Sequence, residues 1–389
     1  MDITITPKKL SGTVAAIPSK SQAHRLLIAA AFADKSTRLI CPKTNQDMEA
    51  TAQCLEALGA EIRRDEKGYA VSPIQSLPET AVLNCRESGS TLRFLLPIAG
   101  ALGVDATFQM AGRLPQRPLS PLWEEMERMG CTLTRPAPDT IRCTGKLQAG
   151  NYTIDGGVSS QFITGLLFAL SLIPGKSHLE ITGKVESRPY ITMTEQVLSL
   201  FGAPQYRSPG EITVEGDWSN GAFWLAAQAL GNGLTVTGLT STSAQGDRAA
   251  AEILPQLNGG TAVICAADIP DLVPILAVTA AAKNGAVFTD IRRLRIKESD
   301  RVASTIAMIQ ALGGKAEATE STLTVSGTGL HGGIVNACND HRIAMSAAIA
   351  STVCAVPVTV LGAQCVQKSY PDFWEEFRRL GGNYEQYLR

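Results

Sequence analysis

The chain has 389 residues, and its 35 lysines and arginines nearly balance 36 aspartates and glutamates, which gives a formal net charge of −1. This balance excludes a broad attraction to nucleic acid or to an anionic membrane, so basic residues that bind a ligand must act locally. The length predicts two domains. Nine cysteines, without a CxxC pair, argue against a disulfide framework and a zinc site, and predict buried, reduced thiols.

Two segments of the sequence indicate where in the cell the protein is found. Residues 1–6 alternate in polarity as a strand does, and no charged-then-apolar leader is visible, so we expect a cytoplasmic protein. Residues 343–367 carry no charge and are long enough to cross a bilayer, but they are rich in small residues and contain Pro357. We interpret them as a buried helix followed by a buried strand, and expect no membrane partner.

Four segments place a cation in the first turn of an expected helix. The cations are Lys20 with Arg25, then Arg93, Lys297 with Arg301, and Arg342, and an apolar run follows each segment. Free N–H groups and the helix dipole favour anions at this end, so a cation there costs from a few tenths to about 1 kcal/mol. Four such segments predict a small, phosphorylated polyanionic substrate that is held against these helix ends.

Six expected helices end in the same way, with apolar residues three positions apart followed by a glycine. These glycines lie 71, 72, 57, 54 and 68 residues apart along the chain, and they are Gly59, Gly130, Gly202, Gly259, Gly313 and Gly381. A unit of this size used six times predicts compact α/β subdomains in two halves. Alternatively, this ending is simply common at helix C-termini, which would account for two or three copies. The Gly-rich residues 215–221 are the candidate boundary.

Several polar residues could carry chemistry, and each has a structural alternative. Ser160 and its neighbours open an apolar helix, where they could bind phosphate or simply cap the helix. Arg117 and Arg188 each precede a proline, which suits aimed guanidinium groups but also ordinary surface arginines. Asp271 could be a helix cap or a buried base with a raised pKa. Glu298 could form an ion pair on its helix or take part in proton transfer.

These residues sit in motifs that resemble the 5-enolpyruvylshikimate-3-phosphate (EPSP) synthase family of enolpyruvyl transferases. The motifs follow the family's order along nearly the whole chain: Pro18-Ser19-Lys20-Ser21 with Arg25, Ser88-Gly89-Ser90-Thr91-Leu92-Arg93, Gln116-Arg117-Pro118, Ser159-Ser160-Gln161, Ser187-Arg188-Pro189-Tyr190, Ile269-Pro270-Asp271, Arg295-Ile296-Lys297-Glu298-Ser299-Asp300-Arg301, Asn339-Asp340-His341-Arg342 and Lys368-Ser369-Tyr370-Pro371-Asp372.

The resemblance implies an α/β fold, a two-domain inside-out α/β barrel built from six βαβαββ repeats, three per domain. A discontinuous lower domain would comprise residues 1–18 and 217–389, and an upper domain residues 19–216. The active site would lie in the interdomain cleft. Anionic substrates would then draw the two halves together.

The resemblance also implies the substrates and their ligands. Shikimate 3-phosphate would be bound by Lys20, Ser21, Arg25, Ser159, Ser160, Gln161, Ser187, Tyr190, Asp271 and Lys297. Phosphoenolpyruvate would be bound by Lys20, Gly89, Arg117, Gln161, Arg301, Arg342 and Lys368. The 5-hydroxyl would attack C2 of phosphoenolpyruvate while C3 takes a proton, and the tetrahedral adduct would then lose phosphate.

For this chemistry we expect Asp271 to act as the base toward the hydroxyl and Glu298 to transfer the proton at the methylene carbon. Lys20 or Lys368 could share the second role. No metal and no other cofactor is expected, since cations can stabilise the phosphate charge and the four histidines lack ligand spacing. We expect a monomer whose only partners are its small-molecule substrates.

Two residues depart from the pattern of the family. Glu87 and Arg293 stand where many family members have Asn, and their charges could compensate each other.

The UDP-N-acetylglucosamine enolpyruvyl transferase is the alternative, but its family has Lys-Asn near the N-terminus and a loop cysteine. This chain has Lys20-Ser21 and no cysteine between Cys85 and Cys131. A nucleic-acid binder would need a basic excess and more than 5% aromatic residues.

Overall fold

A computed structural model describes residues 1–387 of the chain, which folds as two compact units. Unit 1 combines Met1–Ile17 with Glu215–Arg389, and unit 2 is Pro18–Val214. The chain therefore passes twice between the units, within one or two residues of the boundaries expected from the sequence. Each unit has its own hydrophobic core, drawn entirely from its own residues.

Unit 2 alternates strands and helices. Its elements are α1 (Lys20–Ala31), β3 (Thr37–Ile40), α2 (Gln46–Ala57), β4 (Glu61–Asp65), β5 (Gly68–Ser72), β6 (Thr80–Asn84), α3 (Gly89–Leu102), β7 (Asp105–Gln109), η1 (Leu114–Gln116), α4 (Leu122–Arg128), β8 (Cys131–Ala137), β9 (Thr140–Gly145), β10 (Asn151–Asp155), α5 (Ser160–Leu172), β11 (His178–Thr182), α6 (Arg188–Leu200) and β12 (Glu211–Thr213).

Unit 1 begins with two strands and resumes after unit 2. Its elements are β1 (Asp2–Thr6), β2 (Ser11–Ala15), α7 (Trp218–Ala229), β13 (Gly233–Thr237), η2 (Gly246–Ala249), α8 (Ala250–Gln256), β14 (Ala262–Cys265), α9 (Val273–Ala282), β15 (Ala286–Thr289), η3 (Arg292–Ile296), α10 (Arg301–Ala311), β16 (Lys315–Ala318), β17 (Thr322–Ser326), β18 (Gly333–Asn336), α11 (His341–Ala350), η4 (Ser351–Val353), β19 (Val358–Leu361), η5 (Ala363–Lys368), α12 (Phe373–Arg379) and β20 (Asn383–Tyr387).

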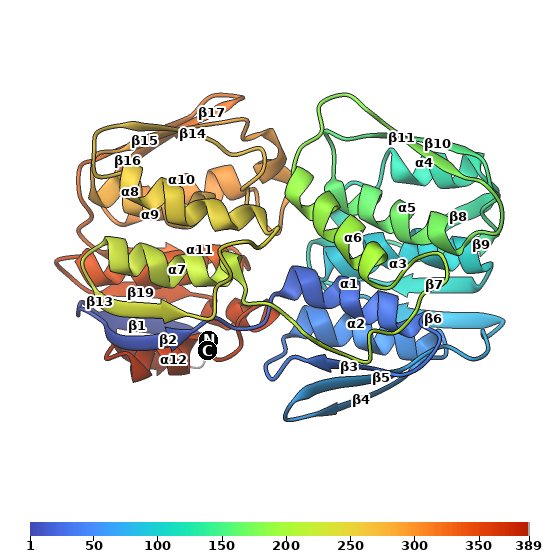
Figure 1. Ribbon diagram of the computed structural model, residues 1–389. Coiled ribbons are helices and arrows are strands. Elements are labelled where there is room, and N and C mark those ends of the chain that lie inside the picture. The colour runs from blue at the N-terminus through green and yellow to red at the C-terminus, as the bar shows by residue number, and fades with distance from the viewer. Residues whose placement is uncertain (388–389) are drawn as a thin grey trace. The chain divides into compact units, whose positions relative to one another are not determined.

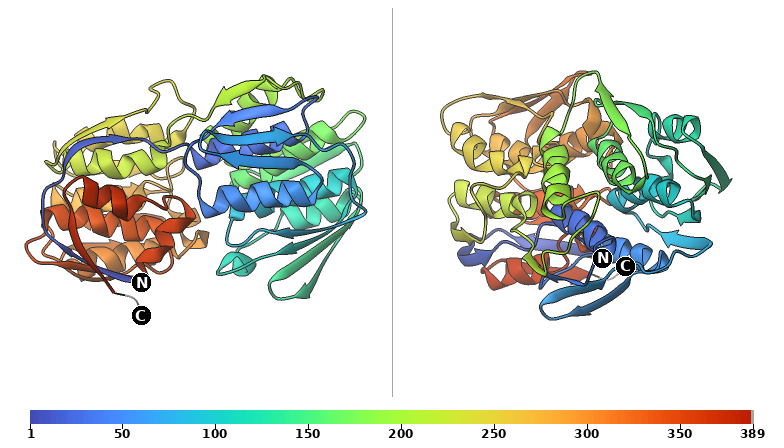
Figure 2. Two further views of the ribbon diagram at one scale, coloured as in Figure 1. Left: turned by 90° about the horizontal axis from the view of Figure 1, so that it is seen from below. Right: turned by 45° about the vertical axis from the view of Figure 1, so that its right-hand side comes forward.

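Four sheets share one topology. Their strand orders are β6-β7-β9-β8, β12-β3-β5-β4, β14-β15-β17-β16 and β18-β19-β1-β20. In each, the first two strands are parallel and the other two are an antiparallel pair, as with β6∥β7 and β8–β9. This pair is a hairpin in the first three sheets. The last sheet is closed by the N-terminal strand, because β1 pairs with β20 in the register Ile3↔Gln386, and the two strands lie side by side in Figures 1 and 2.

Two repeats lack the hairpin, which corrects the expectation of six complete βαβαββ units. The sheets β10-β11 and β13-β2 contain only a parallel pair. The hairpins are absent after Gly202 and after Gly259, at the start of the two shortest intervals between repeat glycines, 57 and 54 residues against 68 to 72 elsewhere. The shorter intervals between these glycines therefore agree with the two missing hairpins.

The open edges of the shortened sheets are partly covered by side chains. Glu125 Oε1 on α4 accepts a hydrogen bond from Thr153 N of β10 at 2.5 Å, and Arg128 donates to the Asn151 carbonyl at 2.6 Å. In unit 1, Arg379 of α12 donates to the Thr13 carbonyl of β2 at 2.7 Å. These contacts satisfy outward-facing backbone groups of strands that have no neighbour on that side.

The six helix ends confirm the glycine signal, with one difference in position. Gly59, Gly130, Gly202, Gly313 and Gly381 all have positive φ after α2, α4, α6, α10 and α12. After α8 the positive φ falls on Gly260 rather than Gly259, because the inserted Asn258 shifts the turn by one residue. A residue with a Cβ is strained in this conformation, which explains why each helix stops at glycine.

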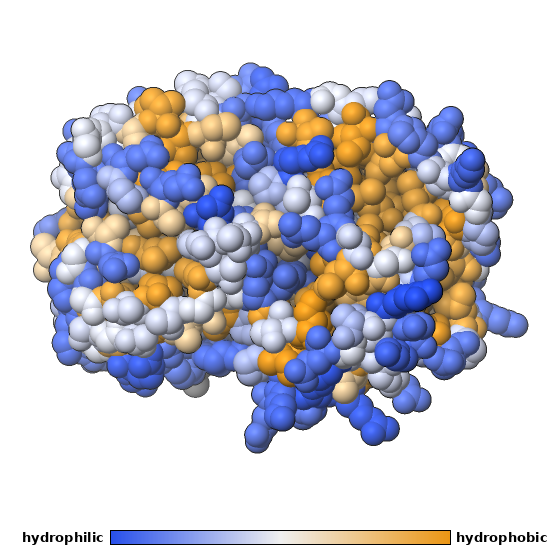
Figure 3. Space-filling view, in the orientation of Figure 1, coloured by the Kyte–Doolittle hydropathy of each residue, from blue (hydrophilic) through white to orange (hydrophobic). Residues whose placement is uncertain are grey.

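The helices fill the middle of each unit and the sheets lie outside them (Figure 1). The strands β6 and β10 alternate exposed and buried residues, as expected for sheets with one face on the core. The helix α9 is buried from Val273 to Ala281, and all its residues but Thr279 are apolar. In the face shown in Figure 3, charged residues are interspersed with apolar ones, and apolar residues reach the surface over α5 and α6.

The uncharged stretch 343–367 forms most of α11, then η4, β19 and most of η5, which confirms the expected buried helix and strand. Within residues 1–387, no helix has both the length and the apolar character needed to cross a bilayer. All nine cysteines are free, but Cys265 and Cys338 are exposed, so the expectation that every thiol is buried was wrong for these two.

Gly165 provides a test of how tightly α3 and α5 pack. A Cβ at this position would lie 2.2 Å from the Arg93 carbonyl oxygen and 2.7 Å from Pro97 Cγ. Because the obstacle is the backbone of the other helix, Gly165→Ala should lower the free energy of unfolding by about 1–3 kcal/mol in urea titrations. Gly259→Ala is the matched control, since that position is exposed and an added Cβ would meet only the Gln256 carbonyl oxygen at 3.7 Å, an ordinary van der Waals contact; its stability should change by less than about 0.5 kcal/mol. Equal stability of both variants would contradict this packing.

Candidate active site

In every repeat, each helix follows a strand. The N-termini of the helices therefore gather at the carboxyl ends of the strands. The motif residues lie at these starts. In unit 2 they belong to α1, α3, α5 and α6, with Arg117 directly after η1. In unit 1 they lie just before or at the start of α9, α10 and α11, and at the end of η5.

Hydrogen bonds show that the helix starts of unit 2 meet. Lys20 Nζ donates to Asp47 Oδ2 at 2.9 Å, which joins the first turns of α1 and α2. Gln161 Nε2 donates to Ser90 Oγ at 3.0 Å, which joins α5 and α3. Thr51 Oγ1 of α2 lies 2.7 Å from Thr91 Oγ1 of α3, which joins the two pairs. The structure therefore brings Lys20, the Gly89 loop and Gln161 into one region, and their role as ligands stays a prediction.

Gly89 lies against two guanidinium groups. A Cβ added to it would stand 2.8 Å from Arg117 Nη1 and 2.9 Å from Arg93 Nη1. Both arginines are buried, and Arg93 also donates to Gln161 Oε1 at 2.8 Å and to the Pro118 carbonyl at 3.1 Å. Arg93 was not among the predicted ligands, although its motif was noted. It is the fifth residue of α3, so the expectation that it lies in the first turn was wrong.

Arg25 faces inward and ties three helices together. Its Nε donates to Thr194 Oγ1 at 2.8 Å, and its Nη2 donates to Thr164 Oγ1 at 3.2 Å and to the Tyr190 carbonyl at 3.0 Å. Its Nη1 donates to the Ser21 carbonyl at 2.6 Å. Burial lowers the pKa of Arg25 to about 9. Most of its donors thus serve the protein, and a direct role toward the substrate stays a prediction.

The predicted phosphate ligands are at the starts of α5 and α6. Ser159 caps α5, with its Oγ accepting from Gln161 N at 3.3 Å, and Ser160 is the first helical residue. Ser187 precedes α6 with φ +56°, a left-handed conformation that costs a non-glycine residue about 1 kcal/mol or more. All three are buried. The expected cap, Ser160, is instead the first residue of the helix, and Ser159 caps it. A capping serine leaves other free N–H groups of the first turn available, so phosphate binding here stays a prediction.

In unit 1, one buried arginine collects three carboxylates from three segments. Arg301 is fully buried, and its Nη1 contacts Asp271 Oδ1 at 2.7 Å. Its Nη2 contacts Glu298 Oε2 at 2.5 Å, and its Nε contacts Asp340 Oδ2 at 3.0 Å. Arg342 Nη2 contacts Asp271 Oδ2 at 2.9 Å. The cations at these helix starts are therefore compensated by the chain's own acids. The sequence offered the ion pair of Glu298 as an alternative, but not the pairs that Asp271 and Asp340 form with Arg301.

The environment of Asp271 corrects the expectation of a raised pKa. Burial opposes ionisation of this carboxyl, but Arg342, Lys297 and Arg301 outweigh it and hold the pKa of Asp271 well below its ordinary value. Asp271 is therefore a carboxylate at neutral pH. It precedes α9 without capping it, because that helix has no side-chain cap.

Two lysines complete the unit 1 cluster. Lys297 Nζ lies 3.9 Å from Asp271 Oδ1, and burial lowers its pKa to about 8. Lys368 is buried, and its Nζ donates to the Asn339 carbonyl at 2.8 Å. Asp271, Lys297, Glu298, Arg301, Arg342 and Lys368 thus gather on the N-terminal side of α9, α10 and α11, together with the end of η5.

Two carboxyls of this cluster were missed by the sequence reading. Asp340 caps α11 and binds both Arg301 and Ser299, with Ser299 Oγ 3.0 Å from Asp340 Oδ2. Its place inside the Asn-Asp-His-Arg motif was the available signal. Asp247 in η2 is buried and hydrogen-bonds to Ser219 Oγ near the start of α7. Burial and the nearby charge of Asp271 raise the pKa of Asp247 to about 7; its sequence offers no comparable signal.

Glu87 and Arg293, the two residues that depart from the family pattern, have different neighbours in the structure. Glu87 lies against Gly112, where a Cβ would stand within 2.4 Å of the carboxylate carbon. Arg293 is buried in η3 and its charge helps to lower the pKa of Lys297. The idea that these two charges compensate each other stays untested.

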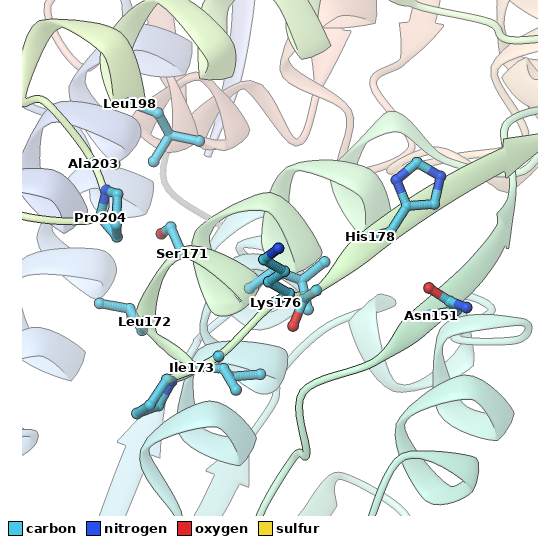
Figure 4. Close-up of a pocket in the computed structure, with 13 residues that line it drawn as sticks. Asn151, Ser171, Leu172, Ile173, Lys176, His178, Leu198, Ala203 and Pro204 are labelled. Atoms are coloured by element: carbon cyan, nitrogen blue, oxygen red, sulfur yellow. The ribbon is translucent and has the colours of Figure 1, made fainter.

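A pocket elsewhere in unit 2 is not part of this site. It lies at the C-terminal end of α5, and Figure 4 shows Ser171, Lys176, His178 and Pro204 among its lining residues. Ser171 is eleven residues after Ser160, so the pocket is roughly 16 Å along the helix from the predicted phosphate ligands. Among the residues that the structure describes, no group of three or more His, Cys, Asp or Glu side chains is placed to hold a metal ion.

The fold is that of enolpyruvyl transferases. A solved structure of EPSP synthase from Acinetobacter baumannii matches with a TM-score of 0.78 at 22% identity, covering 99% of this chain and 100% of that one. The enolpyruvyl transferase NikO from Streptomyces tendae matches with a TM-score of 0.74 at 19% identity, over 99% and 98% of the two chains. At these identities the likeness establishes the fold.

Sequence similarity is more specific. The family model described as EPSP synthase (3-phosphoshikimate 1-carboxyvinyltransferase) matches residues 5–268 and 260–377. The 3-phosphoshikimate 1-carboxyvinyltransferase of Clostridium kluyveri is 38% identical over 422 residues, covering 99% of this chain and 98% of that protein. The enzyme of the same name from Clostridium novyi is 35% identical over 426 residues, covering 98% of each. The chain belongs to the EPSP synthase family.

Arg301 should be far more important for stability than an exposed arginine with similar contacts. Arg301→Gln leaves buried Asp340 without its guanidinium partner and should cost about 3–5 kcal/mol in chemical denaturation. The control is Arg142→Gln, because Arg142 contacts Asp105 Oδ2 at 2.6 Å but is 53% exposed. That variant should lose no more than about 1 kcal/mol. Similar losses in the two variants would show that burial does not set the value of the Arg301 cluster.

Asp247 should make stability depend on pH. The folded pKa of about 7 lies above the ordinary value of 3.8, so the folded state binds more protons between these values and stability falls as pH rises through them. Asp247→Asn removes this titration. Its free energy of unfolding relative to the unmodified chain should therefore increase by about 2.5 kcal/mol from pH 5 to pH 8. A difference that is constant over this range would rule out the raised pKa.

Proposed function

We propose that this chain transfers the enolpyruvyl group of phosphoenolpyruvate to the 5-hydroxyl of shikimate 3-phosphate and releases phosphate. The observation that carries the proposal is the similarity to enzymes named 3-phosphoshikimate 1-carboxyvinyltransferase, which covers essentially the full length of both chains. The clusters described above supply the local chemistry, because they gather helix starts, cations and carboxylates that suit two small anions.

Unit 2 would hold the phosphate of shikimate 3-phosphate. Ser159 and Ser160 open α5, and Ser187 opens α6, so their hydroxyls and the first N–H groups of each helix are natural phosphate donors. Lys20 would add the positive charge. The other proposed contacts to this substrate come from Ser21, Arg25, Gln161 and Tyr190 of unit 2 and from Asp271 and Lys297 of unit 1.

Phosphoenolpyruvate would be bound by cations from both units. Unit 2 would contribute Lys20, Gly89, Arg117 and Gln161, and unit 1 would contribute Arg301, Arg342 and Lys368. The hydrogen of Gly89 leaves room for the two guanidinium groups that stand beside it, since a methyl group there would meet both below 3.0 Å. Close approach of the substrate to the backbone at this loop thus depends on glycine.

We also propose the finer architecture implied by family membership, a two-domain inside-out α/β barrel with the active site in the interdomain cleft. Its support is that each unit separately gathers only part of the ligand set. The two passages of the chain near residues 17 and 214 would then act as hinges, and substrate anions would draw the units together. Scattering profiles that are unchanged by shikimate 3-phosphate with an unreactive phosphoenolpyruvate analogue would contradict this closure.

The proposed mechanism is addition followed by elimination. Asp271 accepts the proton of the 5-hydroxyl as the hydroxyl oxygen forms a bond to C2, and the C2=C3 electrons take a proton at C3. Cleavage of the bond from C2 to the phosphate oxygen and loss of a C3 proton then restore the double bond. Surrounding cations stabilise the charge on the leaving phosphate.

The unit 1 ion pairs suggest how the acid and base roles are set. In the described structure Arg301 and Arg342 stabilise the Asp271 carboxylate and so weaken it as a base. When these guanidinium groups turn to an incoming substrate anion, that stabilisation decreases and Asp271 becomes more basic. Glu298, held by Arg301, is the proposed proton carrier at the methylene carbon, with Lys20 or Lys368 as possible partners.

The remaining proposals concern context. We expect a cytoplasmic monomer that uses no cofactor and binds neither nucleic acid nor membranes, and the net charge of −1 agrees with the last two points. The rival substrate UDP-N-acetylglucosamine is not favoured by the similarity found. The direct test is phosphate release from phosphoenolpyruvate with each acceptor. Turnover should require shikimate 3-phosphate, and turnover with UDP-N-acetylglucosamine alone would overturn the proposal.

The acid and base roles predict two slow variants. Asp271→Asn and Glu298→Gln should each lower kcat by about 10²–10⁴-fold in the phosphate-release assay, since each removes one proton carrier. Glu320→Gln is the control, because Glu320 forms an exposed pair with Arg292 at 3.1 Å. It should leave kcat unchanged. Full turnover by both site variants would refute these roles and leave the substrate assignment intact.

A further inference from the structure

We propose that His24 is a positioning residue for the phosphoenolpyruvate side of the site, because it anchors a buried chain of hydroxyl groups that fixes the start of α3 against α1 and α2. This inference rests on the proposed function. The sequence marked the four histidines, His24 among them, only as lacking metal-ligand spacing, and the hydrogen-bond partner of the His24 ring is Thr51 rather than a predicted ligand.

The chain of hydrogen bonds crosses three helices. His24 Nδ1 lies 2.7 Å from Thr51 Oγ1 of α2, which lies 2.7 Å from Thr91 Oγ1 of α3. Thr91 Oγ1 in turn lies 2.7 Å from Ser88 Oγ, the cap of α3. All four side chains are completely buried. Such a network specifies one arrangement of its members, since every unmade bond would leave a polar group away from water.

The order of donors along the chain identifies the imidazole tautomer. Thr91 Oγ1 donates its single proton to Ser88 Oγ, so Thr51 must be the donor in the contact between the two threonines. Thr51 then has no proton left for His24. The imidazole must therefore donate from Nδ1, and Nε2 carries the lone pair. Nε2 is buried and has no hydrogen-bond partner in the structure, so a second proton there would be unpaired.

This arrangement connects His24 to the Gly89 loop, a proposed phosphoenolpyruvate contact, and places it close to Lys20, which is proposed to contact both substrates and is held separately by Asp47. Lys20 is four residues before His24 and so lies on the same face of α1. Lys20 pairs with Asp47, whose carbonyl lies 3.5 Å from Thr91 Oγ1. Ser88 directly precedes Gly89. The imidazole thus lies near Lys20, at the inner end of the row of hydrogen bonds that holds the Gly89 loop.

The surroundings of the ring oppose a positive charge. Burial, with the charges of Lys20 and Arg25, lowers the pKa of His24 well below its ordinary value of 6.5. The ring meets Phe94 of α3 edge-on, with 6.3 Å between centroids, and Arg25 lies 5.0 Å over the same Phe94 ring. A donor that stays neutral throughout the working pH range is suited to holding a loop and unsuited to proton transfer with substrate.

Nitrogen-15 NMR of histidine side chains in the full chain tests the inference without any assay. The signals that disappear in His24→Asn identify His24. We expect the Nδ1–H tautomer and no titration between pH 5.5 and 8. An Nε2–H tautomer, or titration near pH 6.5, would overturn the proposal. Because this measurement requires no turnover, it remains decisive if the proposed enzymatic function fails.

Kinetics separate positioning from general stability. His24→Leu keeps apolar volume but removes the donor, and should raise the KM for phosphoenolpyruvate about 10-fold while changing the KM for shikimate 3-phosphate less than about 2-fold. His24→Asn keeps an N–H near the Nδ1 position and should stay within about 3-fold of the unmodified chain for both. Exposed His178→Leu is the control. Equal changes in both KM values for His24→Leu, or no rescue by Asn, would contradict a positioning role.

Discussion

The structure depends on one constraint, the common direction of the helices in every repeat. Because each helix follows a strand, its free N–H groups emerge at the carboxyl end of that strand, and three repeats per unit bring several such ends together. These ends carry partial positive charge, and the chain adds Lys20, Arg301 and Arg342 to them. Such a concentration of charge is stable only with negative charge beside it.

The chain supplies that negative charge itself in the described structure. Asp47 pairs with Lys20 in unit 2, and Asp271, Glu298 and Asp340 surround Arg301 in unit 1. We infer that these internal carboxylates hold the cations in place until substrate anions take over part of their role. Binding and acid–base chemistry would then be coupled, because the same guanidinium groups that attract an anion also set the basicity of Asp271.

Features that depend on neighbouring residues could be predicted from the sequence. Contacts between segments that are far apart in the chain could not. Gly59 or Gly313 marks a helix end through its own φ, so the repeat could be found without a structure. The motifs likewise located Lys20 and Arg301. The missing hairpins, the pairing of Arg301 with Asp271 and Asp340, and the burial of Asp247 depend on segments that meet only after folding. The pKa of Asp271 was predicted in the wrong direction because burial was considered without the three cations that outweigh it.

The central claim is that positively charged ends from both units act on the same two anions. Calorimetric titration of shikimate 3-phosphate in the absence of phosphoenolpyruvate tests it most directly, because no turnover occurs. Lys20→Met in unit 2 and Lys297→Met in unit 1 should each weaken binding by at least about 10-fold, the loss expected for one charge-assisted hydrogen bond. Unchanged affinity in either variant, with the fold intact, would contradict a site shared by the two units.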